Sequence, residues 1–105
     1  LKQLGQGDQA RELFERAANL DRDDEDIWLA WAATAAEVTG DQEAFGVLTM
    51  FAQGHPKSVR SRIALALLYQ QMEAYQRTFE MANEVLVLEP KNTAALRIAA
   101  NAGLQ

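Results

Sequence analysis

The sequence predicts an all-α protein, and three observations predict this class. Strong helix formers, chiefly Ala, Leu, Glu, Gln and Arg, dominate the 105 residues. Apolar residues recur at intervals of three and four, which is the period of one helix face. No stretch shows the sustained alternation of apolar and polar residues that marks a half-buried strand. With 49% hydrophobic and 24% charged residues, the composition is that of a globular protein, not a disordered one.

A glycine and a capping residue mark the starts of the first and third predicted helices. Asp8 follows Gly5 and Gly7 and is expected to be the N-cap of the first helix. Gly40 followed by Asp41 repeats this signature, and so ends the second helix and begins the third. The apolar stripes are Ala10, Leu13, Phe14 and Ala17 in the first helix, and Trp28, Trp31, Ala32 and Ala35 in the second. The predicted helices span 8–20, 25–39 and 41–54.

Proline separates the helices in the second half of the chain. Pro56 closely follows Gly54 and is expected in the first turn of the fourth helix, where its missing N–H costs no hydrogen bond. Pro90 is expected to play the same part for the sixth helix. The joint between the fourth and fifth helices, at Glu73 and Ala74, carries no glycine. The apolar stripes are Leu65, Ala66 and Tyr69, and then Phe79, Ala82 and Leu86. The predicted helices span 57–72, 74–88 and 91–102.

The chain also repeats itself. Pro56 and Pro90 are 34 residues apart, and a unit of that length holds two of the predicted helices. The same step pairs Lys57 with Lys91, Ala30 with Ala64, Ala32 with Ala66, Gln42 with Gln76 and Phe45 with Phe79.

These residues resemble the tetratricopeptide repeat (TPR) family, whose pattern reads W-x2-L-G-x2-Y, then A-x3-F, then P. Arg62 stands where the family has an aromatic residue, and Ala82 replaces the bulky Phe. The larger Val85 nearby is expected to fill the volume that Ala82 leaves. The matching residues are Trp28, Trp31, Ala32, Ala35, Ala44, Leu48 and Pro56 in one unit, and Leu65, Ala66, Tyr69, Thr78, Ala82 and Pro90 in the next.

The resemblance implies a TPR-type superhelical solenoid of antiparallel helix pairs, forming a single array over residues 1–105. In such an array each unit packs only on its neighbours, so its stability is roughly a sum of unit and interface contributions. The units are a partial one over 1–22, full ones over 25–58 and 59–92, and a partial one over 93–105.

In this family the first helix of each unit lines a concave groove that holds a partner. The groove positions implied here are Asp26, Leu29, Ala33 and Ala36 in the first full unit, Arg60, Ile63, Leu67 and Gln70 in the second, and Arg97 and Asn101 in the last. An apolar floor flanked by arginine suits an amphipathic helix or an extended peptide. The predicted function is therefore non-enzymatic binding of a protein or peptide partner. The alternative for Leu29 and Ile63 is that they only support a neighbouring helix.

The best-known family members grip a C-terminal carboxylate with Lys, Asn and Arg side chains on this face. The corresponding positions hold side chains that cannot donate a hydrogen bond, so the sequence argues against that class of partner. These positions are Leu29, Ala33, Ala64, Ala94 and Ile98.

A second hypothesis for the function is structural assembly through the ends of the array. The first partial unit lacks its opening helix, which is expected to expose Leu13 and Phe14. The last lacks its closing helix and a polar cap, which is expected to expose Leu96 and Ile98. Because solenoids need polar caps for solubility, self-association or a larger complex would cover these ends.

Little in the sequence points to chemistry. The chain has no cysteine and one histidine, His55, so neither a metal site nor a nucleophile–base pair is expected. The acidic run from Asp21 to Asp26 lacks the glycine and the twelfth-position glutamate of a calcium loop, and is expected to favour the start of a helix. Trp28 and Trp31 are expected in the core, although they could also stack on a ligand. No cofactor is expected.

Charge is divided unevenly along the chain. The net charge is −5, which argues against nucleic-acid binding through phosphates. The half up to residue 52 carries 11 acids and 4 bases, whereas the rest carries 4 acids and 6 bases. This contrast would orient an acidic partner toward the C-terminal half, where Lys57, Arg60 and Arg62 cluster. No membrane span is expected, because the longest nearly apolar run, 27–36, is about half the length that a span needs.

Overall fold

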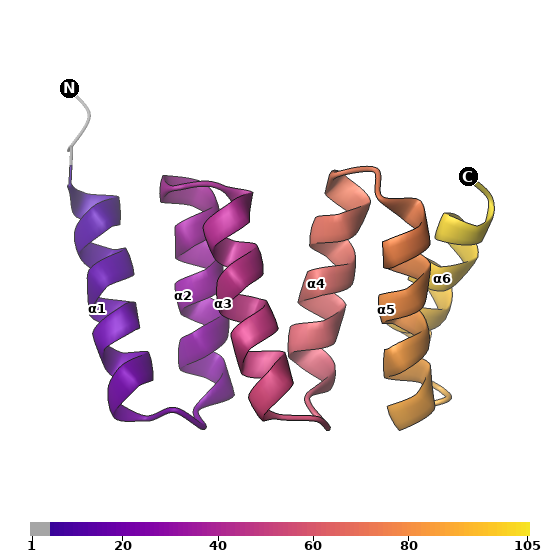
Figure 1. Ribbon diagram of the computed structural model, residues 1–105, viewed down its shortest axis with the longest axis horizontal. Coiled ribbons are helices and arrows are strands. Elements are labelled where there is room, and N and C mark those ends of the chain that lie inside the picture. The colour runs from indigo at the N-terminus through magenta and orange to yellow at the C-terminus, as the bar shows by residue number, and fades with distance from the viewer. Residues whose placement is uncertain (1–4) are drawn as a thin grey trace. The chain divides into compact units, whose positions relative to one another are not determined.

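The computed structural model describes residues 5–105, and over this range the chain forms six helices and no strand (Figure 1). The predicted all-α class is confirmed. The first predicted unit begins within residues 1–4, which lie outside the described residues. The helices are α1 (Gln6–Leu20), α2 (Glu25–Val38), α3 (Asp41–Gly54), α4 (Val59–Gln71), α5 (Tyr75–Leu88) and α6 (Thr93–Gly103).

The chain divides into two compact units, which meet within α3. The N-terminal unit ends at Phe51 and the C-terminal unit begins at Ala52. The boundary follows the density of contacts, whereas the predicted repeats follow the sequence period and run across it. The division into repeat units stays a prediction.

The 34-residue period is visible in the helix caps. Asp24, Ser58 and Asn92 are spaced by this period, and each is the N-cap of the first helix of its repeat. In each case a side-chain oxygen accepts a hydrogen bond from a backbone N–H three residues on, which the helix itself leaves unpaired. The donors are Ile27 N at 3.2 Å, Ser61 N at 3.3 Å and Ala95 N at 2.9 Å.

These caps correct the predicted role of the prolines. Pro56 and Pro90 lie two residues ahead of the caps Ser58 and Asn92, in turns, and not in the first helical turn. The short side chains of the cap residues can reach back to the helix N–H groups, so the helices begin after them.

The start of α1 is also earlier than predicted. Gly5 is the N-cap, with φ 95°, a value that glycine reaches without steric cost. Gln9 N–H already donates to Gly5 O at 2.6 Å, so Asp8 lies inside the first turn. Its carboxylate there favours the positive end of the helix.

The core of the N-terminal unit is built on aromatic rings. Trp28 and Trp31 are buried, as expected, and their ring centroids are 5.2 Å apart. The Trp28 ring also lies 5.6 Å from that of Phe51, which joins α2 to α3. An ion pair between Arg11 and Glu43 at 3.1 Å connects α1 to α3 at the edge of this core.

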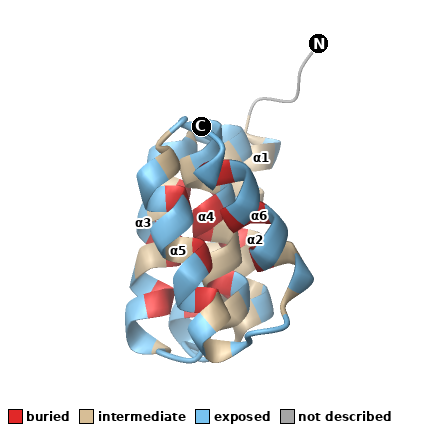
Figure 2. Cartoon of the chain, turned by 90° about the vertical axis from the view of Figure 1, so that its right-hand side faces the viewer, coloured by how far each residue is buried: buried red, intermediate tan, exposed pale blue. Residues whose placement is uncertain are grey.

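The core of the C-terminal unit is made mostly of small residues from α4, α5 and α6. Ala66, Ala82, Ile98 and Ala99 form one cluster, on which Ile63, Met81 and Leu86 pack. Val85 is also fully buried beside Ala82 on α5. Each helix of this unit carries both buried and exposed segments (Figure 2), which is the pattern of an amphipathic helix.

Two predictions are wrong in this unit: Ile98 was expected to be exposed, and Phe79 was expected on the buried face of its helix. Ile98 is 7% exposed, because its face of α6 carries Ala95 and Ala102 and packs into the core. Phe79 is 39% exposed although it belongs to the predicted stripe of α5. The small Ala82 leaves that stripe narrow, and the buried face of α5 runs through Thr78, Ala82 and Val85 instead.

Arg62 organises the turn before α4. Its guanidinium donates to three backbone oxygens, those of Ser58 at 2.9 Å, His55 at 3.1 Å and Ala52 at 3.2 Å. Its Nε donates to the Glu84 carboxylate on α5 at 3.3 Å. Two of these oxygens, those of Ala52 and His55, also accept backbone hydrogen bonds within the turn. The Arg62 guanidinium therefore reinforces the turn and connects it to α5.

Candidate functional site

The C-terminal unit brings two of the predicted groove stripes together. Helices α4 and α6 both pack on α5 and contact each other directly. They stand one repeat apart, so Ile63 matches Arg97 and Leu67 matches Asn101 in register. Their outer residues therefore form one face, which we call the α4–α6 face: Arg60, Ile63, Leu67 and Gln70 from α4, and Arg97 and Asn101 from α6.

Most of this face is accessible. Leu67 is 45% exposed, which is high for a leucine in the middle of a helix. Arg60, Gln70, Arg97 and Asn101 are exposed as well. Ile63 differs from these, because it is half-buried and packs on the core cluster. The supporting role considered for Ile63 is therefore real, and Leu67 is the apolar side chain with the most surface to offer.

In the N-terminal unit the predicted stripe lies on α2. Asp26 and Ala33 are exposed, whereas Leu29 and Ala36 are half-buried.

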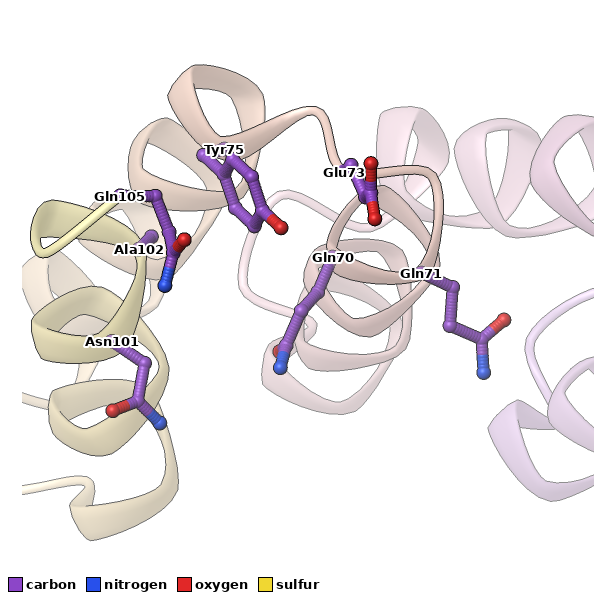
Figure 3. Close-up of a pocket in the computed structure, with 7 residues that line it drawn as sticks. All are labelled: Gln70, Gln71, Glu73, Tyr75, Asn101, Ala102 and Gln105. Atoms are coloured by element: carbon purple, nitrogen blue, oxygen red, sulfur yellow. The ribbon is translucent and has the colours of Figure 1, made fainter.

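A polar pocket of about 230 Å³ opens at the C-terminal ends of α4 and α6. Figure 3 shows Gln70 on α4 and Asn101 on α6 at its sides, with the Tyr75 hydroxyl directed into the space between them in this view. The pocket is lined by Gln70, Gln71, Glu73, Tyr75, Asn101, Ala102 and Gln105.

Sequence reasoning found Gln70 and Asn101 but missed the rest of the pocket. Helix periodicity identifies residues along one face, whereas Glu73 and Tyr75 come from the α4–α5 joint and the start of α5. The signal available in the sequence was the joint without a glycine. There Glu73 adopts φ 59°, the one residue other than glycine with positive φ in the described chain.

The charge contrast seen in the sequence coincides with the division into units. The acidic residues concentrate before Phe51, and the C-terminal unit has more bases than acids. The predicted basic cluster loses one member, because the Arg62 guanidinium is engaged with backbone carbonyls and Glu84. The bases that remain exposed on the α4–α6 face are Arg60 and Arg97.

No group of three or more His, Asp or Glu side chains within residues 5–105 is placed to hold a metal ion. None of the helices in that range has both the length and the apolar character to cross a membrane.

Two solved structures resemble this chain in fold. A mutant of MamA matches 93% of the chain with a TM-score of 0.72 and 20% sequence identity. PcrH, solved in complex with the chaperone binding region of PopD, matches 95% with a TM-score of 0.68 and 20% identity. The fold is a helical repeat of the TPR type. The chain spans 57% of the MamA chain and 75% of the PcrH chain. No family model matches the sequence, and no curated protein matches it.

Proposed function

We propose that this protein is a non-enzymatic interaction module that holds a segment of a protein partner on the α4–α6 face. The observation that carries the proposal is Leu67, a leucine 45% exposed between flanking polar residues on a face built by two helices. Apolar surface in such a setting is typical of a docking site for a peptide or an amphipathic helix. The similar fold of PcrH, which was solved with a region of PopD, supports a partner of this kind.

In this proposal the charges of Arg60 and Arg97 determine which partner segments bind to the face. Both are exposed, Arg60 at the start of α4 and Arg97 in the middle of α6, where they would attract carboxylates of the partner. The α2 stripe of Asp26, Leu29, Ala33 and Ala36 is proposed to contribute further contacts.

Replacing Leu67 with glutamate should weaken peptide binding about tenfold or more, since a buried hot-spot leucine contributes over 1 kcal/mol. Peptides would be selected from a random displayed library on the wild-type protein, and their affinities measured by fluorescence anisotropy.

The matched control is Val87→Glu, because Val87 lies on α5, is 82% exposed and is outside the α4–α6 face. It should bind the same peptides as tightly as the wild type does. Equal binding by Leu67→Glu, or the selection of no peptide at all, would refute the proposed function.

A second function, assembly through the end of the array, is favoured by one observation on α6. Leu96 is 47% exposed and Ala100 is exposed, whereas their repeat equivalents on α2, Trp28 and Ala32, are buried. Trp28 is covered by Phe51 of the following helix, α3. We propose a second copy as the cover for this surface.

Light scattering over a range of concentrations tests the assembly hypothesis. The wild-type mass should rise with concentration, and Leu96→Glu should stay monomeric, because a buried carboxylate opposes association. Val87→Glu again serves as the control and should associate like the wild type. A wild-type protein that is monomeric at every concentration would exclude this function.

A further inference from the structure

The polar pocket differs in chemistry from the rest of the α4–α6 face. Arg60 carries a positive charge at the start of α4 and Arg97 another in the middle of α6, but no cation lines the pocket. Its one charged residue is Glu73. The other polar groups of the lining are the side-chain amides of Gln70, Gln71, Asn101 and Gln105 and the hydroxyl of Tyr75, each of which has an oxygen that can accept a hydrogen bond.

The side chains of the pocket are available to a ligand. Within residues 5–105, neither the Glu73 carboxylate nor the side chains of Gln70, Tyr75 and Asn101 take part in a hydrogen bond or an ion pair. Glu80, Glu84 and Glu89, the other acids of this unit, all accept hydrogen bonds from the protein. Glu73 is thus the acid of the unit whose side chain accepts no hydrogen bond from the described residues.

The backbone of Glu73 provides an independent observation. Its φ of 59° lies in the left-handed region, which costs a residue with a Cβ roughly 1 kcal/mol more than glycine. The bonds of the α4 C-terminus, Ala74 N–H to Tyr69 O at 2.9 Å and Glu73 N–H to Gln70 O at 3.0 Å, hold it there. This is the left-handed ending of α4, and it places Glu73 in the lining of the pocket.

The size of the pocket limits its occupant. Its volume of about 230 Å³ is below the range of roughly 300–1,000 Å³ that small-molecule sites occupy. A single long side chain suits it better. The pocket also lies about 15 Å along α4 from Arg60, given the helical rise over the intervening residues. One extended segment of a few residues can reach both places.

We propose that the pocket binds a lysine or arginine side chain of the partner segment, with Glu73 as the counter-charge and Gln70, Tyr75 and Asn101 as acceptors. The inference rests on the proposed function and adds to it the direction in which the partner segment binds. The partner would place an acidic residue near Arg60 and Arg97, apolar residues on Leu67, and a base in the pocket. Because Arg60 and Glu73 place opposite charges at the two ends of α4, the segment would bind in only one direction. A carboxylate in the pocket would instead face Glu73 without a cation to offset the repulsion.

A double-mutant cycle on the protein and a selected peptide tests the inference. Peptides taken from the displayed library should carry a lysine or arginine at one end. Each would be synthesised with that base and with methionine in its place, and bound to wild type and to Glu73→Gln. The base should improve binding to the wild type about tenfold and to Glu73→Gln less than about twofold, since only the first keeps the charge pair. Glu80→Gln, an exposed carboxylate on α5, is the control and should behave as the wild type does.

Glu73→Gly provides a second variant, which removes the carboxylate and relieves the backbone. It should be at least as stable as the wild type and should lose the preference for the base as Glu73→Gln does. Selected peptides without a base, or a preference that persists in both Glu73 variants, would overturn the inference. If those peptides still depended on Leu67, the proposed function would stand. If no peptide were selected, both would fall.

Discussion

Replacing Trp28 with alanine is expected to lower the free energy of unfolding by about 3–5 kcal/mol, as truncation of a buried aromatic side chain does. Trp28 is 4% exposed and its ring contacts both Trp31 and Phe51, so the substitution removes the centre of the N-terminal core. Urea unfolding followed by circular dichroism, with linear extrapolation, measures the loss.

A second variant at the same position separates packing from hydrogen bonding. The indole N–H of Trp28 is buried and has no hydrogen-bond partner in the part of the chain described. Trp28→Phe therefore removes no bond and should cost about 1–2 kcal/mol, much less than the alanine variant. Leu20→Ala, at an exposed position, should change stability by less than about 0.5 kcal/mol. A Trp28→Phe variant as unstable as Trp28→Ala would show that the indole N–H does have a partner.

Replacing Arg62 with methionine should lower the free energy of unfolding by about 2–4 kcal/mol, because several hydrogen bonds of one charged group are lost together. The guanidinium reaches three carbonyl oxygens and Glu84 at once. Lysine is expected to recover little of the loss, since one ammonium cannot reproduce the geometry of the fork. Thermal or urea unfolding of both variants provides the measurement.

Arg77→Met is the control for this prediction, because Arg77 is an exposed arginine of the same unit. Its stability should stay within about 0.5 kcal/mol of the wild type. If Arg62→Met were equally mild, the contacts of the guanidinium would contribute nothing to the fold.

Trp28, Arg62 and Leu96 occupy the same position of the repeat, 34 residues apart. The sequence identified Arg62 as a departure from the family pattern but not what it does. Only the structure shows that the aromatic core contact made by Trp28 is replaced by a network of hydrogen bonds at Arg62. At Leu96 the same position is half exposed. The repeat pattern predicts which positions are equivalent. The residues that surround each position decide which contacts its side chain makes.

In the candidate site, too, some residues could be predicted from the sequence and others only from the structure. Helical periodicity was enough to place Leu67, Gln70 and Asn101 on outward faces, because it depends only on residue spacing along one helix. The contribution of Glu73 and Tyr75 could not be predicted, since it depends on the left-handed turn at Glu73 that brings the two helix ends and the joint together.

The sequence by itself determined the helices and their order, because both depend on residues within one or two turns of each other. Helix propensity, the spacing of apolar residues and a capping side chain three residues from its N–H are all local. The tertiary structure decided which apolar residues are buried, as with Ile98 and Phe79, and which polar ones meet in a pocket. These outcomes depend on the volumes and charges of residues far apart in the chain, which packing alone brings into contact.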